Sequence, residues 1–161
     1  MRLDDLAKQV GRRLGEARAV LVTAESCTGG WVAQAVTSVS GSSGWFERGY
    51  VTYSNDAKQE LLGVRAETLA HHGAVSEETV REMALGALAR SKGTICAAVT
   101  GVAGPTGGTK DKPVGMVCFA WARRDGRMRS EIRRFRGDRE SVRKQSVIRA
   151  LEGVLELLDA G

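Results

Sequence analysis

The stretch Ala19-Val-Leu-Val-Thr-Ala-Glu-Ser-Cys-Thr-Gly-Gly-Trp-Val-Ala-Gln-Ala-Val36 decides the fold of this chain. Residues 19–23 form a short apolar, β-branched run that is typical of a buried strand. The glycine-bearing segment 26–30 is a turn, and residues 31–36 resume with helical spacing. Strand, tight turn and helix in immediate succession indicate a layered α/β domain. This order places the side chains of the turn at or near a helix N-terminus.

The rest of the chain continues the alternation of helices and strands. Apolar spacing and capping residues predict helices over residues 3–15, 57–62, 66–71, 77–90 and 138–158, and β-branched or apolar runs predict strands at 49–53, 94–99, 114–121 and 129–135. The strand at 94–99 is apolar on both faces, so we expect it near the sheet centre. Asp125-Gly126 predicts a β-hairpin between the last two strands. We therefore predict an α/β fold, a single layered domain over residues 1–161 with a mixed β-sheet flanked by helices.

Composition and the N-terminal residues indicate a folded protein of the cytoplasm. A chain of 161 residues with 42% hydrophobic and 27% charged residues has the composition of one globular domain. The N-terminus carries Asp4 and Asp5 where a signal peptide needs a basic start and an apolar run. No stretch approaches the length that spans a bilayer. We therefore expect a cytoplasmic protein without a membrane partner.

Cysteine and histidine usage argues against a metal site. The three cysteines, Cys27, Cys96 and Cys118, are an odd number at wide spacing, so they indicate neither a disulfide framework nor a CxxC half-site. His71 and His72 precede Gly73, which favours a helix C-terminus for them rather than catalysis. We expect no metal and no cofactor.

The net charge of +5 comes from one part of the chain. Residues 123–149 hold eleven Lys/Arg and four Asp/Glu. Such a patch can attract nucleic acid, a phosphorylated small molecule or nothing in particular. The interleaved aromatic residues of a nucleic-acid stacking platform are missing from it. We favour solvated strand and helix faces for most of these arginines and expect no nucleic-acid partner.

Three polar, glycine-bearing segments each directly follow a predicted strand. They are residues 25–30, 53–58 and 100–108. In open α/β sheets the carboxyl ends of the strands form the ligand crevice. We therefore expect these three segments to meet at one sheet edge and to form the functional site.

Ser26 and Lys58 are the candidate nucleophile and base within these segments. A serine on a strand-to-helix turn can project its hydroxyl while neighbouring N–H groups bind an oxyanion. The turn lacks the G-x-S-x-G pattern, however, and on local pattern alone a helix-capping serine is the better interpretation. Lysine serves as base only when neutral, which burial or a helix N-terminus promotes. The alternative for Lys58 is a solvated surface lysine, and Tyr53 either orients the pair or fills the core.

The loop 101–108 and Arg139 are candidate phosphate binders. Four glycines in eight residues let backbone N–H groups approach a phosphate or an oxyanion closely. The loop lacks the ending of a P-loop, so a flexible connection is an equal alternative. Arg139 stands at a predicted helix start and can either anchor a phosphate or remain an ordinary exposed arginine.

Taken in order, several strings resemble the CinA C-terminal domain family from about residue 4 to about residue 158. They are Thr23-Ala-Glu-Ser-Cys-Thr-Gly-Gly30, Val51-Thr-Tyr-Ser-Asn-Asp-Ala-Lys58, Leu61-Leu-Gly-Val64, His72-Gly-Ala-Val-Ser-Glu-Glu78, Ala98-Val-Thr-Gly-Val-Ala-Gly-Pro105, Gly107-Gly-Thr109 and Lys112-Pro-Val-Gly115. The family includes stand-alone nicotinamide-nucleotide amidases. The resemblance implies metal-free hydrolysis of nicotinamide mononucleotide to nicotinate mononucleotide and ammonia, a step of pyridine nucleotide salvage.

The resemblance also implies roles for individual residues. Ser26 would be the nucleophile, Lys58 its base and Tyr53 an assisting residue. The implied substrate-binding residues are Glu25, Cys27, Thr28, Gly29, Gly30, Thr100, Gly101, Gly104, Gly107, Gly108 and Arg139. Two departures from the family pattern, at Arg48-Gly-Tyr50 and at Lys110-Asp-Lys112, bear on substrate selectivity rather than on chemistry.

Two other function classes remain open at this point. One is a non-catalytic nucleotide-binding or competence/damage-related regulatory module, in which Lys58 only neutralises phosphate. The other is a nucleic-acid binder that uses residues 123–149, whose affinity would fall steeply with salt. We expect a homodimer or a higher homo-oligomer, because a hairpin edge and a long terminal helix offer contact surfaces.

Overall fold

The computed structural model describes residues 2–160 and holds one five-stranded mixed sheet. Its strands are β1 (Leu21–Glu25), β2 (Phe46–Val51), β3 (Ile95–Gly101), β4 (Met116–Arg123) and β5 (Met128–Arg134). The strand order is β2-β1-β3-β4-β5, in which β2, β1 and β3 run parallel while β4 and β5 form the antiparallel hairpin. This topology confirms the predicted mixed sheet with β3 at its centre.

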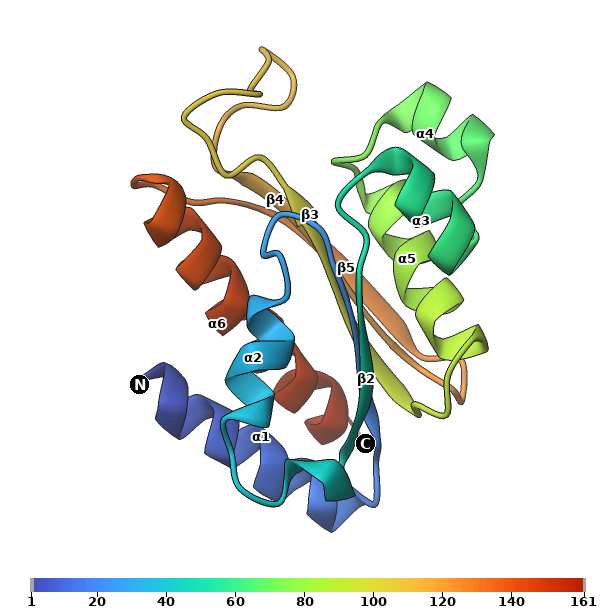
Figure 1. The fold of residues 1–161 in the computed structure, drawn as a ribbon, viewed down its shortest axis with the longest axis vertical. Helices are drawn as coiled ribbons and strands as arrows, with labels where there is room; N and C mark the ends of the chain where they lie inside the picture. Colours follow the sequence, from blue (N-terminus) through green and yellow to red (C-terminus); the bar gives the residue numbers. More distant parts are fainter. Residues whose placement is uncertain (1, 161) are drawn as a thin grey trace.

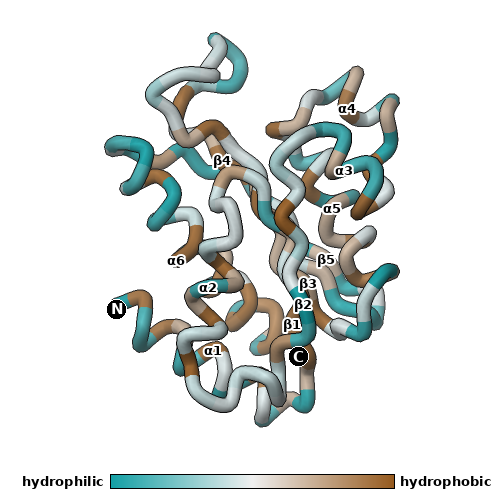
Figure 2. Tube along the Cα trace, in the orientation of Figure 1, coloured by the Kyte–Doolittle hydropathy of each residue, from teal (hydrophilic) through white to brown (hydrophobic). Residues whose placement is uncertain are grey.

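Helices cover both faces of the sheet (Figure 1). One face is covered by α1 (Leu3–Ala17), α2 (Trp31–Thr37) and α6 (Arg139–Asp159), and the other by α3 (Asn55–Leu62), α4 (Ala66–His72) and α5 (Glu77–Ala89). A short 3-10 helix, η1 (Ser42–Gly44), precedes β2. Figure 2 shows hydrophobic positions turned toward the sheet and hydrophilic ones toward the outside. The fold is therefore a three-layer α/β sandwich.

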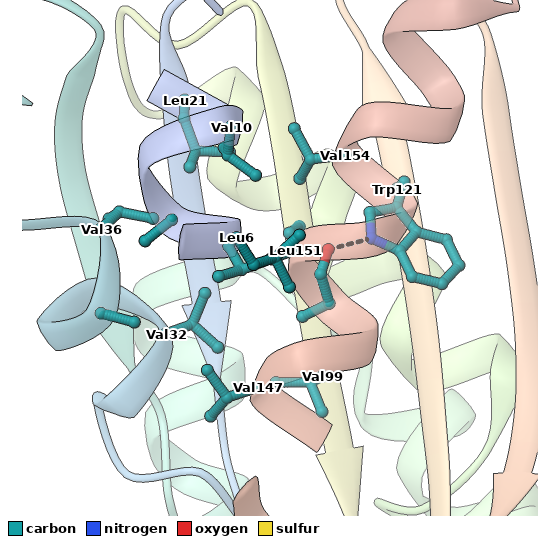
Figure 3. Packing of buried hydrophobic residues seen from close by; sticks show 14 of the residues in the cluster. Leu6, Val10, Leu21, Val32, Val36, Val99, Trp121, Val147, Leu151 and Val154 are labelled. Carbon is teal, nitrogen blue, oxygen red and sulfur yellow. Dashed lines mark hydrogen bonds between the residues drawn. The ribbon is translucent and has the colours of Figure 1, made fainter. Parts of the chain in front are cut away.

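Each face of the sheet has its own buried cluster. The larger cluster joins α1, α2 and α6 to the sheet, with Leu6, Leu151 and Val147 among its fully buried members (Figure 3). Trp121 reaches this cluster from β4, and its indole Nε1–H donates to the carbonyl oxygen of Ala150 at 2.8 Å. The second cluster lies between α5 and the opposite face. Burial on both faces explains why β3 has no alternating polar positions.

Two strands differ from their predicted limits, because pairing with neighbours decides where a strand ends. The first strand was expected at 19–23, but the ladder spans 21–25, where every residue pairs with both β2 and β3. The second was expected at 49–53, but β2 begins at Phe46 opposite Leu21 and ends at Val51. The chain beyond Val51 leaves the ladder and turns toward α3. Ser26 therefore lies closer to the end of β1 than expected, and Lys58 lies farther from the end of β2.

Helix limits agree better with the prediction. Ser54, Ser76 and Asp138 cap α3, α5 and α6 by accepting hydrogen bonds from backbone N–H groups of the first turns. α1 runs two residues past its expected end at Gly15, since Arg18 takes the left-handed conformation that closes the helix. His71 and His72 form the last turn of α4, as the sequence indicated. In residues 2–160, no helix has the length and apolar character that crossing a bilayer requires.

Candidate active site

Ser26 follows β1 directly, and its backbone is still held by the sheet. Its N–H donates to the carbonyl oxygen of Val99 on β3 at 3.0 Å. On the other side, the carbonyl oxygen of Glu25 accepts from the N–H of Thr52 at 2.8 Å. The Ser26 side chain is only 7% exposed. The hydroxyl therefore projects from a rigid point with little access to solvent.

Lys58 lies in the first turns of α3 and is 1% exposed. Its Nζ lies 3.0 Å from Ser26 Oγ, 2.9 Å from the carbonyl oxygen of Thr52 and 3.4 Å from that of Tyr53. These three partners are uncharged oxygens. The structure thus brings the predicted pair into hydrogen-bond contact and excludes a solvated surface lysine.

Burial lowers the pKa of Lys58 below its ordinary value of 10.5. The direction is the one that a lysine base requires, and its largest cause is the loss of solvation on burial. Neighbouring Cys27 behaves differently, because burial, with the Glu25 charge adding to it, raises the pKa of its thiol to about 12. The thiol of Cys27 therefore keeps its proton at neutral pH, and the side chain in hydrogen-bond contact with Lys58 Nζ is Ser26.

The buried carboxylate of Glu25 stabilises the turn between Ser26 and α2. Its carboxylate accepts hydrogen bonds from the N–H groups of Val32 (2.8 Å) and Ala33 (3.0 Å) at the start of α2, and from the Thr28 hydroxyl (2.6 Å). Glu25 is 1% exposed and does not line the cavity described below. It caps α2 rather than pointing at a substrate, and it holds the Thr28 side chain away from the cavity as well.

The turn leaves two successive backbone N–H groups free beside Ser26. The N–H of Ser26 is used by Val99 and that of Gly29 by the Ser26 carbonyl oxygen. Within residues 2–160, the N–H groups of Cys27 and Thr28 have no acceptor. These two N–H groups are therefore the candidate donors for the oxyanion site that the sequence analysis expected in this turn. Gly29 and Gly30 have φ angles of 61° and 104°, which lets the chain reverse into α2.

A cavity of about 220 Å³ opens over the serine and the lysine at the carboxyl ends of the parallel strands. Its lining comes from all three predicted segments, from the α4–α5 connection and from the start of α6: Ser26, Cys27, Tyr53, Lys58, Ala74, Val75, Thr100, Gly101, Ala103 and Arg139. The convergence expected from the strand order is thus present. Sequence reasoning missed Ala74 and Val75, which carry no reactive group, although they lie within the family-like string 72–78.

The glycine loop contributes less to the cavity than predicted. Thr100 and Gly101 line it, and the Thr100 hydroxyl donates to the carbonyl oxygen of Ala74 at 3.0 Å. A Cβ on Gly101 would lie 2.9 Å from the Met116 carbonyl oxygen, so the pairing of β3 with β4 itself requires glycine there. Gly107 and Gly108 are exposed in the loop that rises from the sheet edge (Figure 1) and, like Gly104, are absent from the lining.

Arg139 and Tyr53 form the rim of the cavity. Arg139 is the first residue of α6, and its guanidinium donates to the carbonyl oxygen of Gly104 at 2.9 Å and to the Tyr53 hydroxyl at 3.2 Å. The Tyr53 side chain is 63% exposed, so it does not fill the core. Its contribution to Lys58 comes from the backbone carbonyl. Both residues line the same cavity as Ser26.

Arg143 touches the turn and was missed by the sequence analysis. Its Nε and one terminal nitrogen donate to the carbonyl oxygens of Cys27 (3.1 Å) and Thr28 (3.0 Å). The guanidinium also lies 5.5 Å from the ring centre of Trp31. In a stretch with eleven basic residues nothing singles Arg143 out, except that it follows Arg139 by one helical turn.

Other arginines of the basic stretch tie the fold together. Arg149 is buried and contacts Glu131 and Glu156 through charged hydrogen bonds. Arg124 donates to the carbonyl oxygens of Leu88 and Gly93. The expectation of a solvated face is therefore wrong for Arg149, whose charge is satisfied inside the molecule, whereas Arg124 is exposed in agreement with it. Across residues 2–160, no three His, Cys, Asp or Glu side chains gather in a way that could hold a metal ion.

Comparison with known proteins places this geometry in a family. The model of the CinA C-terminal domain matches residues 3–158. The nicotinamide-nucleotide amidohydrolase PncC of Escherichia coli K12 is 53% identical over 93% of this chain and 91% of its own length. The protein of the same name from Pseudomonas putida is 54% identical over 94% of each chain. A putative competence-damage inducible protein of Symbiobacterium thermophilum is 49% identical over 96% of this chain but only 38% of its own length.

Solved structures agree with these matches. A CinA superfamily protein from Klebsiella pneumoniae superposes with a TM-score of 0.96 at 41% identity, with both chains covered completely. The competence/damage inducible protein CihA of Agrobacterium tumefaciens superposes with a TM-score of 0.93 at 44% identity, covering 98% of this chain and 95% of that one. The whole sheet and both helical layers are therefore shared.

Proposed function

This chain belongs to the CinA C-terminal domain family, and we propose that it converts nicotinamide mononucleotide to nicotinate mononucleotide and ammonia through Ser26 and Lys58. It is a nicotinamide-nucleotide amidohydrolase, an enzyme that acts on a non-peptide amide, like the relatives that share about half of its residues over nearly the full length. The observation that carries the proposed mechanism is the 3.0 Å contact between Lys58 Nζ and Ser26 Oγ, two side chains buried at the floor of one cavity.

The surroundings of Lys58 suit a neutral amine that accepts a proton. A neutral amine has two N–H groups and one lone pair. The carbonyl oxygens of Thr52 and Tyr53 take the two N–H groups, which leaves the lone pair for the Ser26 hydroxyl. Since burial lowers the pKa of Lys58, the neutral form is reached at a lower pH than for a free lysine. Lys58 is thereby oriented as the base for Ser26.

The first half of the reaction forms an ester on Ser26. Ser26 Oγ attacks the carboxamide carbon while its proton passes to Lys58 Nζ. The carbonyl oxygen becomes an oxyanion, which the N–H groups of Cys27 and Thr28 stabilise, a type of contact worth about 3 kcal/mol per donor. The C–N bond then breaks, Lys58 returns the proton to the leaving nitrogen, and ammonia departs.

The second half regenerates the enzyme. A water molecule takes the place of ammonia, and Lys58 accepts its proton as the oxygen attacks the ester carbon. The same two N–H groups stabilise the second oxyanion. The bond to Ser26 Oγ breaks, Lys58 gives the proton back to the serine, and nicotinate mononucleotide leaves.

The shape of the site suggests how the nucleotide lies. The enclosed floor near Ser26 and Thr100 suits the nicotinamide ring, and the ribose phosphate points outward. At the rim, the Arg139 guanidinium has five N–H groups, of which the contacts to Gly104 and Tyr53 use two. The remaining N–H groups can bind the phosphate. Glu25, Gly104, Gly107 and Gly108 then act by shaping the turn and the loop.

An assay of ammonia release tests the proposal. Nicotinamide mononucleotide is incubated with the wild-type protein, with Ser26→Ala and with Lys58→Ala. Ser43→Ala is the matched control, because Ser43 is exposed in η1, at the sheet edge opposite the site. We expect turnover by the wild type and the control and none above background by Ser26→Ala. Tight binding of the nucleotide by the wild type without turnover would instead indicate a regulatory binding module.

We further propose that the protein is cytoplasmic and forms a homo-oligomer. The three cysteines are free and buried, which suits the reducing cytoplasm. Met128 and Ile132 expose apolar surface on the edge strand β5, which supports a homodimer or a higher homo-oligomer. Light scattering of the purified protein measures the assembly, and a monomer mass at micromolar concentration would contradict it.

A further inference from the structure

Arg143 holds the turn that follows Ser26 from a distant part of the chain. It belongs to the second turn of α6, which packs against α2 and β3. Its two donors reach the carbonyl oxygens of Cys27 and Thr28, and the guanidinium lies against the Trp31 ring. Arg143 does not line the cavity. Its polar contacts are therefore directed at the backbone of the turn and not at the space that a substrate would fill.

The peptide units of the turn show what these contacts do. The carbonyl of Cys27 and the N–H of Thr28 belong to one peptide group, which is trans in the structure. In a trans peptide the two groups point in opposite directions. When Arg143 holds the Cys27 carbonyl oxygen, it also sets the direction of the free N–H of Thr28. That N–H is one of the two donors assigned above to the oxyanion.

The second contact stabilises the neighbouring peptide unit. The carbonyl oxygen of Thr28 accepts from Arg143 and from the N–H of Trp31, which is 3.0 Å away. The N–H of the same peptide group belongs to Gly29 and closes the turn on the Ser26 carbonyl oxygen at 3.0 Å. That Ser26 carbonyl shares its peptide group with the free N–H of Cys27. Arg143 thus acts on both free donors, on one directly and on the other through Gly29.

We propose that Arg143 is a positioning residue for the hydrolysis, which fixes and polarises the Cys27 and Thr28 N–H groups for the oxyanion formed after attack by Ser26. The proposal rests on the proposed function. A cation at the carbonyl end of a peptide group withdraws electrons from its N–H end and makes that N–H a stronger donor. Arg143 therefore acts on the charge that develops in the transition state and leaves the binding of the substrate to other residues.

The role of Arg143 differs from that of Arg139, one turn earlier on α6. Arg139 lines the cavity at its rim, where a phosphate can reach it. Loss of a group that binds substrate and transition state equally raises KM, whereas loss of a group that acts only on the transition state lowers kcat. We therefore expect loss of the Arg139 side chain to raise KM and loss of the Arg143 side chain to lower kcat.

The experiment compares Arg143→Met and Arg143→Lys with Lys144→Met, the exposed neighbour on the same helix. Methionine keeps an unbranched stem against Trp31 but has no donor, and lysine can reach one of the two carbonyl oxygens. We expect kcat for nicotinamide mononucleotide to fall about 100-fold in Arg143→Met, with KM within about threefold of the wild type. Arg143→Lys should lie between the two, and Lys144→Met should match the wild type.

A second measurement keeps the inference separate from the choice of substrate. A fluorophosphonate probe reacts with an activated serine through an oxyanion-like transition state, and its rate of labelling at Ser26 needs no knowledge of the substrate. We expect labelling of Arg143→Met to slow in parallel with kcat. If the wild type labels at Ser26 but releases no ammonia, the proposed function fails, and the labelling rates still test Arg143.

Three results would overturn the inference. They are an unchanged kcat and labelling rate in Arg143→Met, a loss confined to KM, and an Arg143→Lys variant that performs no better than Arg143→Met although both are folded by circular dichroism. If Arg143→Met does not fold, Arg143→Lys decides the question by itself. A folded Arg143→Lys with wild-type kcat and labelling would then reject the positioning role.

Discussion

Lys58 Nζ lies 3.0 Å from Ser26 Oγ although thirty-two residues separate the two in the sequence. The contact exists because β1 and β2 run parallel and end at the same edge of the sheet, after which one strand turns into α2 and the other into α3. Both side chains are buried there. The pair is thus a product of topology, and its chemistry depends on burial.

Replacing Lys58 with methionine should remove the base while keeping an unbranched stem. We expect kcat to fall about 10² to 10⁴-fold, the range for loss of a positioned base. In the wild type, kcat/KM should rise with pH as the amine loses its proton, with the midpoint below 10.5 because burial lowers the pKa of Lys58. The residual rate of Lys58→Met should lack this rise. Ammonia release measured across pH tests both points, and a Lys58→Met profile that keeps the same rise would assign the titration to another group.

The same substitution should change how stability depends on pH. Unfolded Lys58 keeps its proton up to about its ordinary pKa of 10.5, whereas the folded protein releases it at lower pH. Between these two pKa values the unfolded chain binds more protons, so the free energy of unfolding of the wild type rises with pH relative to that of Lys58→Met. Below both pKa values Lys58 is charged in the folded and in the unfolded protein. There the free energy of unfolding of the wild type is at its lowest relative to that of Lys58→Met. Urea unfolding of both proteins measures the difference, and a slope of the opposite sign would contradict the lowered pKa.

Glu25 should contribute to the stability of the fold. In Glu25→Gln, the amide oxygen can accept one N–H at the start of α2, but the NH₂ group faces a second donor and cannot bond to it. We expect a loss of about 2 kcal/mol in the free energy of unfolding, seen as a lower urea midpoint with unchanged slope. Glu60→Gln, on the exposed side of α3, is the control and should leave the midpoint unchanged. Equal midpoints for Glu25→Gln and the wild type would show that the cap contributes nothing.

The order and type of the elements could be predicted from the sequence because periodicity records which faces are buried. Strand limits could not, since the pairing of Leu21 with Phe46 and with Ile95 decides them and no local pattern reveals it. The ladder therefore lies two residues later on β1 than expected. The starts of α3, α5 and α6 were located to within two residues, because a cap is a local interaction between neighbours in the chain.

The site was predictable in outline for a topological reason. Three polar segments after parallel strands must meet at one edge, and the cavity contains residues from all three. What local sequence could not supply is the pairing of Ser26 with Lys58, which the family resemblance provided. Arg143 was missed because its role depends on the position of α6, and Val75 because an apolar side chain gives no chemical signal.

We expect Arg149 to stabilise the fold and not to take part in substrate binding. Its guanidinium contacts Glu131 at 2.7 Å and Glu156 at 2.6 Å, and it lies 5.1 Å from the Trp121 ring centre. Arg149→Met removes the buried guanidinium that the two carboxylates share, although Glu131 keeps Arg133 and Glu156 keeps Arg129 as a partner. We expect a loss of about 2 kcal/mol in the free energy of unfolding, with kcat unchanged. Arg136→Met, an exposed change in the same basic stretch, should alter neither quantity. Loss of kcat in folded Arg149→Met would show that this ion-pair cluster reaches the site.

Substituting two helical glycines, Gly86 and Gly15, distinguishes the effect of packing against α3 from the effect of helix propensity. A Cβ on Gly86 of α5 would lie 1.8 Å from the carbonyl oxygen of Leu62, the last residue of the helix that carries Lys58. Gly86→Ala must therefore push α3 away, at a cost of about 1 to 3 kcal/mol, and it should lower kcat by displacing Lys58. Gly15 in α1 is exposed with no atom within 4 Å of an added Cβ, so Gly15→Ala should stabilise by about 0.5 to 1 kcal/mol.

Thermal and urea unfolding combined with ammonia release distinguish the two effects. Both variants replace a helical glycine with alanine, so the gain in helix propensity is common to them, and only Gly86→Ala adds the collision with α3. If Gly86→Ala were destabilised but kept full kcat, α3 would adjust without moving Lys58 from Ser26. If it were as stable as Gly15→Ala, the close approach of α5 to α3 would be absent in solution. The expected result, lower stability together with lower kcat, would tie the position of the catalytic base to the packing of α5.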